Sequence, residues 1–313
     1  MKTLIVGAGG VGGYFGGRLL EAKRDVTFLV RARRAEQLAR TGLVIRSPHG
    51  NVDVPAPPTV QAANLAQHFD LIVLSCKAYD LDSAIDSFAP AVGPDTVILP
   101  LLNGMRHLEV LEAKFGRDAV LGGHCLISAA LDAEGRIVHL NDLHTITFGE
   151  RSGSRSERAD DILAELMSAR FNTVLSEAIV GEMWEKWTFI ATLAGMTCLM
   201  RASLGDIIAA GGVDLSLALM NECVAIARDA GYPPRDAALQ RIHATVTNAS
   251  STLAASMLRD IERGAQTEGE QILGDLLRRQ PRAGNERSLL RLAYTHLKAY
   301  EARQSRESVK NPT

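Results

Sequence analysis

The sequence has no strong imbalance of charge. Its 34 lysines and arginines are offset by 36 aspartates and glutamates, which leaves a formal net charge of −2 over 313 residues. This balance argues against a bulk electrostatic partner such as duplex DNA or an anionic membrane. Hydrophobic residues make up 46% of the chain and charged residues 22%, so global disorder is also excluded. We expect neither a nucleic-acid nor a membrane partner.

Cysteine is scarce, and long hydrophobic runs are missing. The four cysteines, Cys76, Cys125, Cys198 and Cys223, show no Cys-x-x-Cys spacing and do not form a disulfide framework. We expect reduced thiols, no metal site and a cytoplasmic location. The longest uncharged stretch near the middle, residues 187–200, is too short to span a bilayer and fits a buried helix.

Short apolar runs alternate with helical patterns in the first half of the chain. The expected strands are 4–6, 26–30, 71–74 and 97–99, and the expected helices are 11–21, 34–40, 81–88 and 105–115. Alternation of this kind predicts an α/β Rossmann-type doubly wound parallel sheet. Two excursions are expected to be antiparallel hairpins, one over 42–55 and one joining 135–140 to 144–149, before a helix near 158–170.

The second half changes character after Leu175, because almost no strand runs follow. The expected helices are 177–200, 215–230, 234–263, 268–279 and 286–303, with breaks at Gly211-Gly212, 231–234, Gly264 and Pro281. A length of 313 residues corresponds to about two domains at about 150 residues each. We therefore predict a dinucleotide-binding domain over 1–175 and an all-α domain over 176–313.

A glycine-rich motif follows the first expected strand. Gly7-Ala8-Gly9-Gly10-Val11-Gly12 matches Gly-x-Gly-x-x-Gly and opens a helix, which is the context of a dinucleotide-binding turn. We expect Gly7 to make the tight turn, Gly9 to admit a pyrophosphate and Gly12 to allow close packing of helix and strand. The same glycines also fit a turn that binds no ligand.

Basic residues stand where the second strand ends. Enzymes that use NAD usually place an acid about 20 residues after the glycine motif, where it binds the ribose 2′-hydroxyl. This chain has Arg31 and Arg33 instead, and a guanidinium can bind a 2′-phosphate through paired hydrogen bonds. The sequence thus favours NADP(H), although a solvated basic start of a helix fits the same residues.

Three further polar residues have positions that suggest chemistry. Lys77 and Asn103 follow expected strands, at the carboxyl edge where ligands bind in doubly wound folds, though Asn103-Gly104 also fits a plain turn. Lys186 begins the uncharged helical stretch. A partly desolvated ammonium there could donate a proton to an alkoxide, while the spacing alone also fits a surface pair with Glu182.

Together these motifs resemble the ketopantoate reductase (2-dehydropantoate 2-reductase) family. The resemblance rests on GAGGVG, Lys77 in CKAYD, Asn103 in LLNGM, Lys186 in MWEKW, and Ser256 with Glu268 in SMLRDIERGAQTE, and it covers nearly the whole chain in order. It implies a Rossmann domain and a helical domain similar to the C-terminal domain of 6-phosphogluconate dehydrogenase. It also implies reduction of ketopantoate to pantoate with NADPH, on the route to pantothenate, by a monomer or homodimer.

The resemblance assigns roles to single residues. Lys186 is implied as the proton donor and a substrate contact, and Arg31 as the ligand of the 2′-phosphate. Lys77 and Asn103 are implied to hold the nicotinamide end, with Asn103 also touching the substrate. Ser256 is implied to contact the substrate and Glu268 the cofactor.

The chain departs from the family pattern in its substrate pocket. Where well-known members carry asparagines, it has Ile190, Ala194 and Leu204, which cannot hydrogen-bond a substrate. Three interpretations follow: a ketopantoate reductase, a reductase of a more apolar 2-oxo acid or ketone, and a non-catalytic NADP(H) sensor. Thr192, Thr197 and Arg201, on or beside the same helix, are candidates to replace the missing hydrogen bonds.

Overall fold

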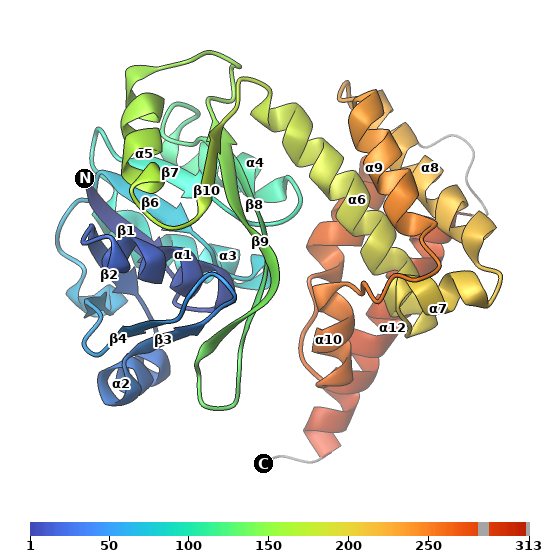
Figure 1. The fold of residues 1–313 in the computed structure, drawn as a ribbon, viewed down its shortest axis with the longest axis horizontal. Coiled ribbons are helices and arrows are strands. Elements are labelled where there is room, and N and C mark those ends of the chain that lie inside the picture. Colours follow the sequence, from blue (N-terminus) through green and yellow to red (C-terminus); the bar gives the residue numbers. More distant parts are fainter. Residues whose placement is uncertain (281–287, 311–313) are drawn as a thin grey trace. The chain divides into compact units, whose positions relative to one another are not determined.

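The apolar runs of the first half form a parallel sheet in a computed structural model of the chain, which describes residues 1–280 and 288–310 (Figure 1). Its strands are β1 (Lys2–Val6), β2 (Asp25–Leu29), β5 (Thr59–Val60), β6 (Leu71–Leu74) and β7 (Val97–Pro100). They pair in the order β5-β2-β1-β6-β7, all parallel. The four predicted strands are confirmed, as is the doubly wound fold class.

Helices lie between the strands along this half of the chain. They are α1 (Gly10–Glu21), α2 (Ala32–Thr41), α3 (Leu81–Phe88), α4 (Arg106–Phe115) and α5 (Glu157–Met167), with short 3-10 turns η1 (Ala62–Asn64), η2 (Ala78–Asp80) and η3 (Ala89–Ala91). The five predicted helices of this half are therefore confirmed to within a few residues. The N-terminus of α5 is capped by Ser156, whose side chain accepts a hydrogen bond from the backbone N–H of Ala159.

A second sheet completes this half. Its strands are β3 (Leu43–Arg46), β4 (Val52–Val54), β8 (Gly122–Leu131), β9 (Ile137–Gly149) and β10 (Asn172–Leu175). The predicted hairpin over 42–55 is confirmed, because β3 and β4 pair antiparallel. The predicted hairpin within 135–149 is wrong, since this segment is the single strand β9, paired antiparallel with β8. The polar residues 141–142 mark an irregularity where Asn141 Oδ1 accepts from Ser128 N (3.0 Å), and they do not form a turn.

Helix α1 lies between the two sheets because glycines remove side chains from two of its faces. A Cβ atom on Gly16 would lie 2.6 Å from the Phe28 ring of the parallel sheet, and one on Gly17 would lie 2.6 Å from Ile45 of the second sheet. Either contact is closer than real Cβ atoms approach, so the helix or the neighbouring side chain would have to shift. The glycine-rich start of the chain therefore serves packing as well as any ligand.

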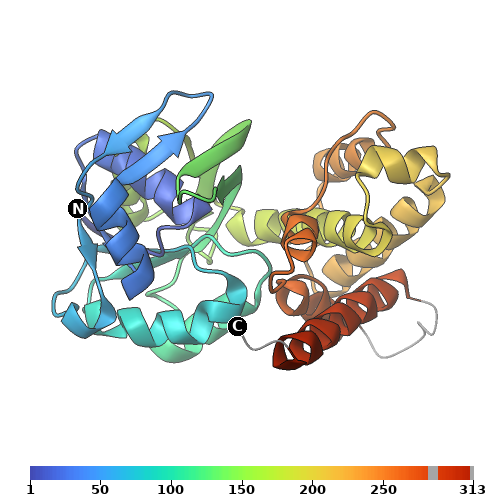
Figure 2. The same ribbon diagram turned by 90° about the horizontal axis from the view of Figure 1, so that it is seen from below.

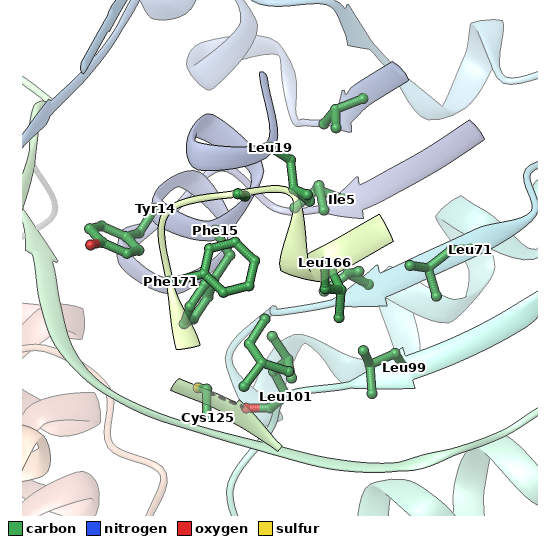
Figure 3. Packing of buried hydrophobic residues seen from close by; sticks show 14 of the residues in the cluster. Ile5, Tyr14, Phe15, Leu19, Leu71, Leu99, Leu101, Cys125, Leu166 and Phe171 are labelled. Atoms are coloured by element: carbon green, nitrogen blue, oxygen red, sulfur yellow. Dashed lines mark hydrogen bonds between the residues drawn. The ribbon is translucent and has the colours of Figure 1, made fainter. Parts of the chain in front are cut away.

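The core of this half is made of large apolar side chains from both sheets and α1 (Figure 3). Phe15 of α1 and Phe171, just before β10, meet edge to face with ring centroids 4.9 Å apart. Cys125 of β8 lies in the same cluster, and its Sγ approaches the carbonyl of Leu101 at 3.9 Å. Burial of these side chains stabilises the fold by roughly 1.5–3 kcal/mol each.

Three histidines stack beside the N-terminal helix. The His49 and His144 rings are 3.8 Å apart between centroids and nearly parallel, and His139 lies 5.9 Å from His144. His144 Nδ1 is 2.8 Å from the Tyr14 hydroxyl. Burial, then the two neighbouring histidines and Arg18, lowers the pKa of His144 to about 4. We call His49, His139 and His144 the histidine stack.

The second half is helical throughout its described part, 181–280 and 288–310 (Figures 1 and 2). Its helices are α6 (Ile179–Met200), α7 (Leu204–Ala209), α8 (Val213–Asp229), α9 (Asp236–Val246), α10 (Ser256–Glu262), the π-helix η4 (Glu270–Gly274), α11 (Asp275–Arg278) and α12 (Leu289–Lys310). An apolar cluster from α8 and α9 forms part of its core, with Phe189 of α6 against it. The predicted all-α class of this half is confirmed.

Two helix predictions are corrected here. The single helix expected over 234–263 is wrong, because α9 and α10 are separated by a loop in which Asn248 Oδ1 accepts from Ser250 N (3.0 Å). The short helix α7 was not predicted, although Ser203 and Asp206 form a capping box at its start. The predicted break at Pro281 and the helix start at Glu286 lie outside the described residues.

The chain folds into two compact units. The first holds residues 1–102 and 107–180, and the second holds 103–106 and 181 onward. All four cysteines are free thiols, as expected, and three of them are buried. In the ranges 1–280 and 288–310, no helix is long and apolar enough to cross a membrane.

Candidate active site

The parallel sheet brings three predicted site elements to one edge of the first unit. The glycine motif follows β1, Arg31 follows β2 and Lys77 follows β6. Strands β2 and β6 both pair with β1 in parallel, so the residues after all three strands emerge at the same edge. The order β2-β1-β6 also makes this the point where the chain reverses its direction of travel across the sheet, where doubly wound folds bind ligands.

The glycine motif has the geometry that a bound pyrophosphate requires. Gly7 makes the tight turn with φ +95°, and its N–H donates to the carbonyl of Leu29 (3.0 Å) at the end of the neighbouring strand β2. No atom lies within 4 Å of a Cβ built on Gly9, so the backbone there is open to a ligand at the N-terminus of α1. A Cβ on Gly12 would collide with the Gly7 carbonyl and the Ser75 hydroxyl, which requires glycine for close packing.

Arg34 supports this turn, a role that was not predicted from the sequence. Its Nε donates to the carbonyl of Ala8 (3.0 Å) inside the glycine motif, and its Nη1 donates to the carbonyl of Gly135 (2.9 Å) between β8 and β9. Burial lowers the pKa of Arg34 below its ordinary value. The arginine thus ties the turn to the second sheet through backbone carbonyls. Because every residue has a backbone carbonyl, no sequence motif reveals this contact.

Arg31, which follows β2, is paired with an acid from the loop after β6, on the other side of β1. Its Nη2 donates to Asp80 Oδ1 (2.7 Å) and to Ser83 Oγ (3.1 Å). The hydrogen bond and charge of Asp80 raise the pKa of Arg31, while 72% of the Arg31 side chain stays exposed. Asp80 was not predicted, although it follows β6 by the same rule that selected Lys77.

Lys77 begins the 3-10 turn η2 and is half-buried. Its carbonyl accepts the N–H of Asp80 (2.9 Å), so the turn that presents Lys77 also presents the acid that pairs with Arg31. The carboxyl edge of the sheet therefore carries the cations of Arg31, Arg34 and Lys77 and the carboxylate of Asp80 near the glycine motif.

In the second unit, Lys186 lies half-buried on α6, in a rigid surrounding. The preceding residue, Glu185, accepts two hydrogen bonds from the Arg235 guanidinium (both 2.7 Å), and Glu182 accepts a third (3.2 Å). The following residue, Trp187, is fully buried, and its Nε1 donates to the carbonyl of Ile272 (2.9 Å). The contacts made by the residues before and after Lys186 therefore hold this turn of α6 in place.

Asn103 and Glu268 lie beside the π-helix η4 of the second unit. A Cβ on Gly104 would be 2.9 Å from the Gln271 carbonyl and 3.8 Å from the Trp187 ring, so the Asn103-Gly104 turn packs on η4 and α6. Gly104 has φ +80°, which favours glycine. Glu268 is buried immediately before η4. Single π-turns in helices often occur at functional sites. This one is contacted by Gly104 and Trp187, the neighbours of Asn103 and Lys186, and it directly follows Glu268 and Gly269.

Ser256 is placed elsewhere in the second unit. It is exposed on the first turn of α10, and the preceding Ala255 donates its N–H to Thr197 Oγ1 (3.3 Å) on α6. Thr197 is about 16 Å along the helix from Lys186 at 1.5 Å per residue. The start of α10, which carries Ser256, therefore contacts the C-terminal half of α6.

The apolar positions that depart from the family pattern are packed. Ala194 and Leu204 are buried, and Ile190 is half-buried. Thr192 and Thr197 do not replace the missing hydrogen bonds, because both are fully buried and donate to helix carbonyls four residues earlier. Arg201 is exposed, with its guanidinium 5.7 Å from the centre of the Tyr300 ring.

A dinucleotide-type turn in one unit and a half-buried lysine in a helical unit define an oxidoreductase of the Rossmann class. The chain belongs to the ketopantoate reductase family. The family model described as "Ketopantoate reductase PanE/ApbA" matches residues 3–153, and the one described as "Ketopantoate reductase PanE/ApbA C terminal" matches residues 178–301. Enzymes of this family are oxidoreductases acting on CH–OH groups, and ketopantoate reductases use NADPH.

Individual relatives agree with this assignment. The "Uncharacterized oxidoreductase YkpB" of Bacillus subtilis is 41% identical over 96% of this chain and 99% of its own length. A 2-dehydropantoate 2-reductase of Pyrococcus horikoshii is 28% identical over 96% of this chain and 98% of its own. The crystal structure of 2-dehydropantoate 2-reductase from Geobacter metallireducens has a TM-score of 0.86 at 25% identity, covering 96% of this chain and 99% of that one.

Proposed function

We propose that this protein is an NADPH-dependent reductase that converts a 2-oxo acid to a 2-hydroxy acid. The observation that carries the proposal is Lys186, half-buried and fixed by Trp187 and Glu185, in a chain whose first unit keeps an open glycine turn. A sensor that only binds a dinucleotide has no need of a positioned ammonium. Family membership supports the same reaction class.

The residues at the sheet edge fit a dinucleotide. The open backbone at Gly9 and the N-terminus of α1 suit a pyrophosphate, and Arg31 suits a 2′-phosphate. Lys77 and Asn103 are proposed to hold the nicotinamide end, and Glu268 to contact the cofactor. When bound, NADPH supplies the hydride that reduces the carbonyl carbon.

Residues of the second unit are proposed to act on the substrate. The Lys186 ammonium polarises the carbonyl oxygen and then donates its proton to the developing alkoxide. Asn103 and Ser256 orient the substrate by hydrogen bonds. The structure of α6 supports the role of Lys186, because bonds from the two adjacent residues limit its motion.

Two substrate classes are proposed for the same site. Ketopantoate, reduced to pantoate on the route to pantothenate by a monomer or homodimer, follows from the family. A more apolar 2-oxo acid or ketone is favoured by Ile190, Ala194 and Leu204. The relatives are compatible with both classes, because the 41% identical protein is named only as an oxidoreductase and the named 2-dehydropantoate 2-reductase is 28% identical.

Steady-state NADPH oxidation with a panel of 2-oxo acids, ketopantoate included, tests the proposal. The reductase function predicts at least one substrate with kcat/KM of about 10⁴ M⁻¹s⁻¹ or more. The highest value for ketopantoate would select the family reaction, and a higher value for a bulkier apolar acid would select the second class. Tight NADPH binding without turnover of any panel member would instead favour a sensor.

A further inference from the structure

The pairing of Arg31 with Asp80 leaves the arginine poorly disposed to grip a phosphate. A guanidinium binds an oxyanion through two parallel N–H groups, on either its Nε–Nη2 edge or its Nη1–Nη2 edge. Both edges include Nη2, and Asp80 and Ser83 each accept a hydrogen bond from Nη2. Two-pronged binding of a 2′-phosphate by Arg31 therefore requires Nη2 to release either Asp80 or Ser83, and the Asp80 carboxylate is the charged competitor of the two.

The pair also lies at the carboxyl edge beside the glycine motif, where doubly wound folds bind dinucleotides. Arg31 follows β2 and Asp80 follows β6, and these two strands flank β1 and its glycine motif. The ion pair thus spans the end of β1 at the carboxyl edge. A carboxylate at this edge is the group that NAD enzymes use to accept the ribose 2′-hydroxyl, although they usually place it after the second strand.

We infer that Asp80 is a specificity-determining residue that weakens selection of NADPH over NADH. Its carboxylate competes with a 2′-phosphate for Arg31 and repels that phosphate, while it can accept a hydrogen bond from the 2′-hydroxyl of NADH. This inference rests on the proposed function, and in particular on a dinucleotide binding at the glycine motif. Because 72% of Arg31 and 32% of Asp80 are exposed, the pair is weak enough for a ligand to exchange.

Asp80 can be substituted without loss of a helix-capping hydrogen bond. Asp80 is the N-cap position of α3, yet its side chain makes no capping hydrogen bond, so Asp80→Asn should leave the helix intact. Asp86→Asn is the matched control. It removes the same charge from an exposed position on the same helix, one and a half turns further along.

Calorimetric titration of the full-length protein with NADPH, NADH, 2′,5′-ADP and 5′-AMP tests the inference. The two fragments isolate the 2′-phosphate from effects at the nicotinamide end. We expect Asp80→Asn to raise the preference for 2′,5′-ADP over 5′-AMP, and for NADPH over NADH, by about 5-fold or more relative to Asp86→Asn. The NADPH gain should shrink at high salt.

An unchanged or reduced preference in Asp80→Asn would overturn the inference, and would show that Asp80 merely holds Arg31 in place for the phosphate. The proposed function would survive that result as long as the wild-type protein binds NADPH. A wild-type protein that binds neither dinucleotide would overturn the proposed function itself, together with this inference. Measuring wild type first therefore separates the two failures.

Discussion

The indole Nε1 of Trp187 donates a 2.9 Å hydrogen bond to the carbonyl of Ile272, 85 residues further along the chain. This bond joins α6 to the π-helix η4 directly beside Lys186. Both atoms are buried, so the carbonyl has no access to water if the indole is removed. The position of the proposed proton donor thus depends on a contact made by its neighbour.

Trp187→Phe should lower the free energy of unfolding by about 1–3 kcal/mol, because the Ile272 carbonyl loses its donor inside the protein. Urea denaturation followed by circular dichroism measures the change. Trp184→Phe is the control, since Trp184 is also buried but stacks on Tyr232 and leaves the Trp187 bond in place. An equal loss in both variants would mean that ring volume, and not the hydrogen bond, stabilises this region.

Lys186→Ala should lower kcat by roughly 10²–10⁴-fold on the best substrate of the panel, which is the usual contribution of a positioned general acid. The NADPH dissociation constant and the melting temperature should stay near those of the wild type. Rapid-mixing measurements of NADPH oxidation detect the effect. Near-normal turnover in the variant would remove Lys186 from the mechanism.

Two substitutions in the glycine motif should separate folding from binding. Gly12→Ala should destabilise the protein, because the new Cβ collides with the Gly7 carbonyl and the Ser75 hydroxyl. Gly9→Ala meets no atom within 4 Å and should change the free energy of unfolding by less than about 1 kcal/mol, while weakening NADPH binding at least several-fold. Thermal unfolding and calorimetric titration of both variants test this. Unimpaired NADPH binding by Gly9→Ala would contradict a pyrophosphate at this turn.

The histidine stack should make the protein less stable in acid. The pKa of His144 is about 4 in the folded protein and about 6.5 when unfolded, so the unfolded chain binds more protons between these values. The stability that depends on neutral His144 is therefore present above about pH 6.5 and is lost as the pH falls toward 4. His49, His139 and Arg18 face His144 and oppose its protonation.

Urea unfolding at pH 7.5 and at pH 5 measures this effect. His144→Asn should reduce the difference in unfolding free energy between the two pH values. His243→Asn, at an exposed position on α9, should leave the difference unchanged. Equal pH dependence in wild type and His144→Asn would mean that other groups cause the acid sensitivity.

Much of the fold could be predicted because strands that are buried on both faces appear in the sequence as short, continuous apolar runs. Strands β1, β2, β6 and β7 are short apolar runs between helical segments, as expected for parallel strands that are buried on both faces. Strand β9 was misread because Asn141 and Asp142 have turn-forming side chains, whereas its partner β8 supplies the pairing that keeps the chain extended. Whether such a segment forms a strand or a turn depends on pairing with residues that are distant in the sequence, and a local sequence pattern gives no information about that pairing.

The candidate site could be predicted where a residue acts through its own chemistry and its place after a strand. Arg31 and Lys77 were found in this way. Asp80 and Arg34 were missed because their roles depend on contacts across the fold, with Arg31 and with the Ala8 carbonyl. The burial of Thr192 and Thr197 likewise could not be predicted from helical periodicity, because packing in the folded domain decides which side chains of α6 are buried.

The segment Asn103–Arg106 belongs to the second unit, although β7 before it and α4 after it belong to the first. The polypeptide thus passes between the units after residues 102, 106 and 180. A fragment ending at residue 180 would keep Gly104 but lose the Gln271 carbonyl on which it packs. The same mismatch would arise in a chimera that joins this fragment to the helical half of a distant relative. The two halves are therefore poor candidates for modular exchange, and a swap has to carry residues 103–106 with the helices.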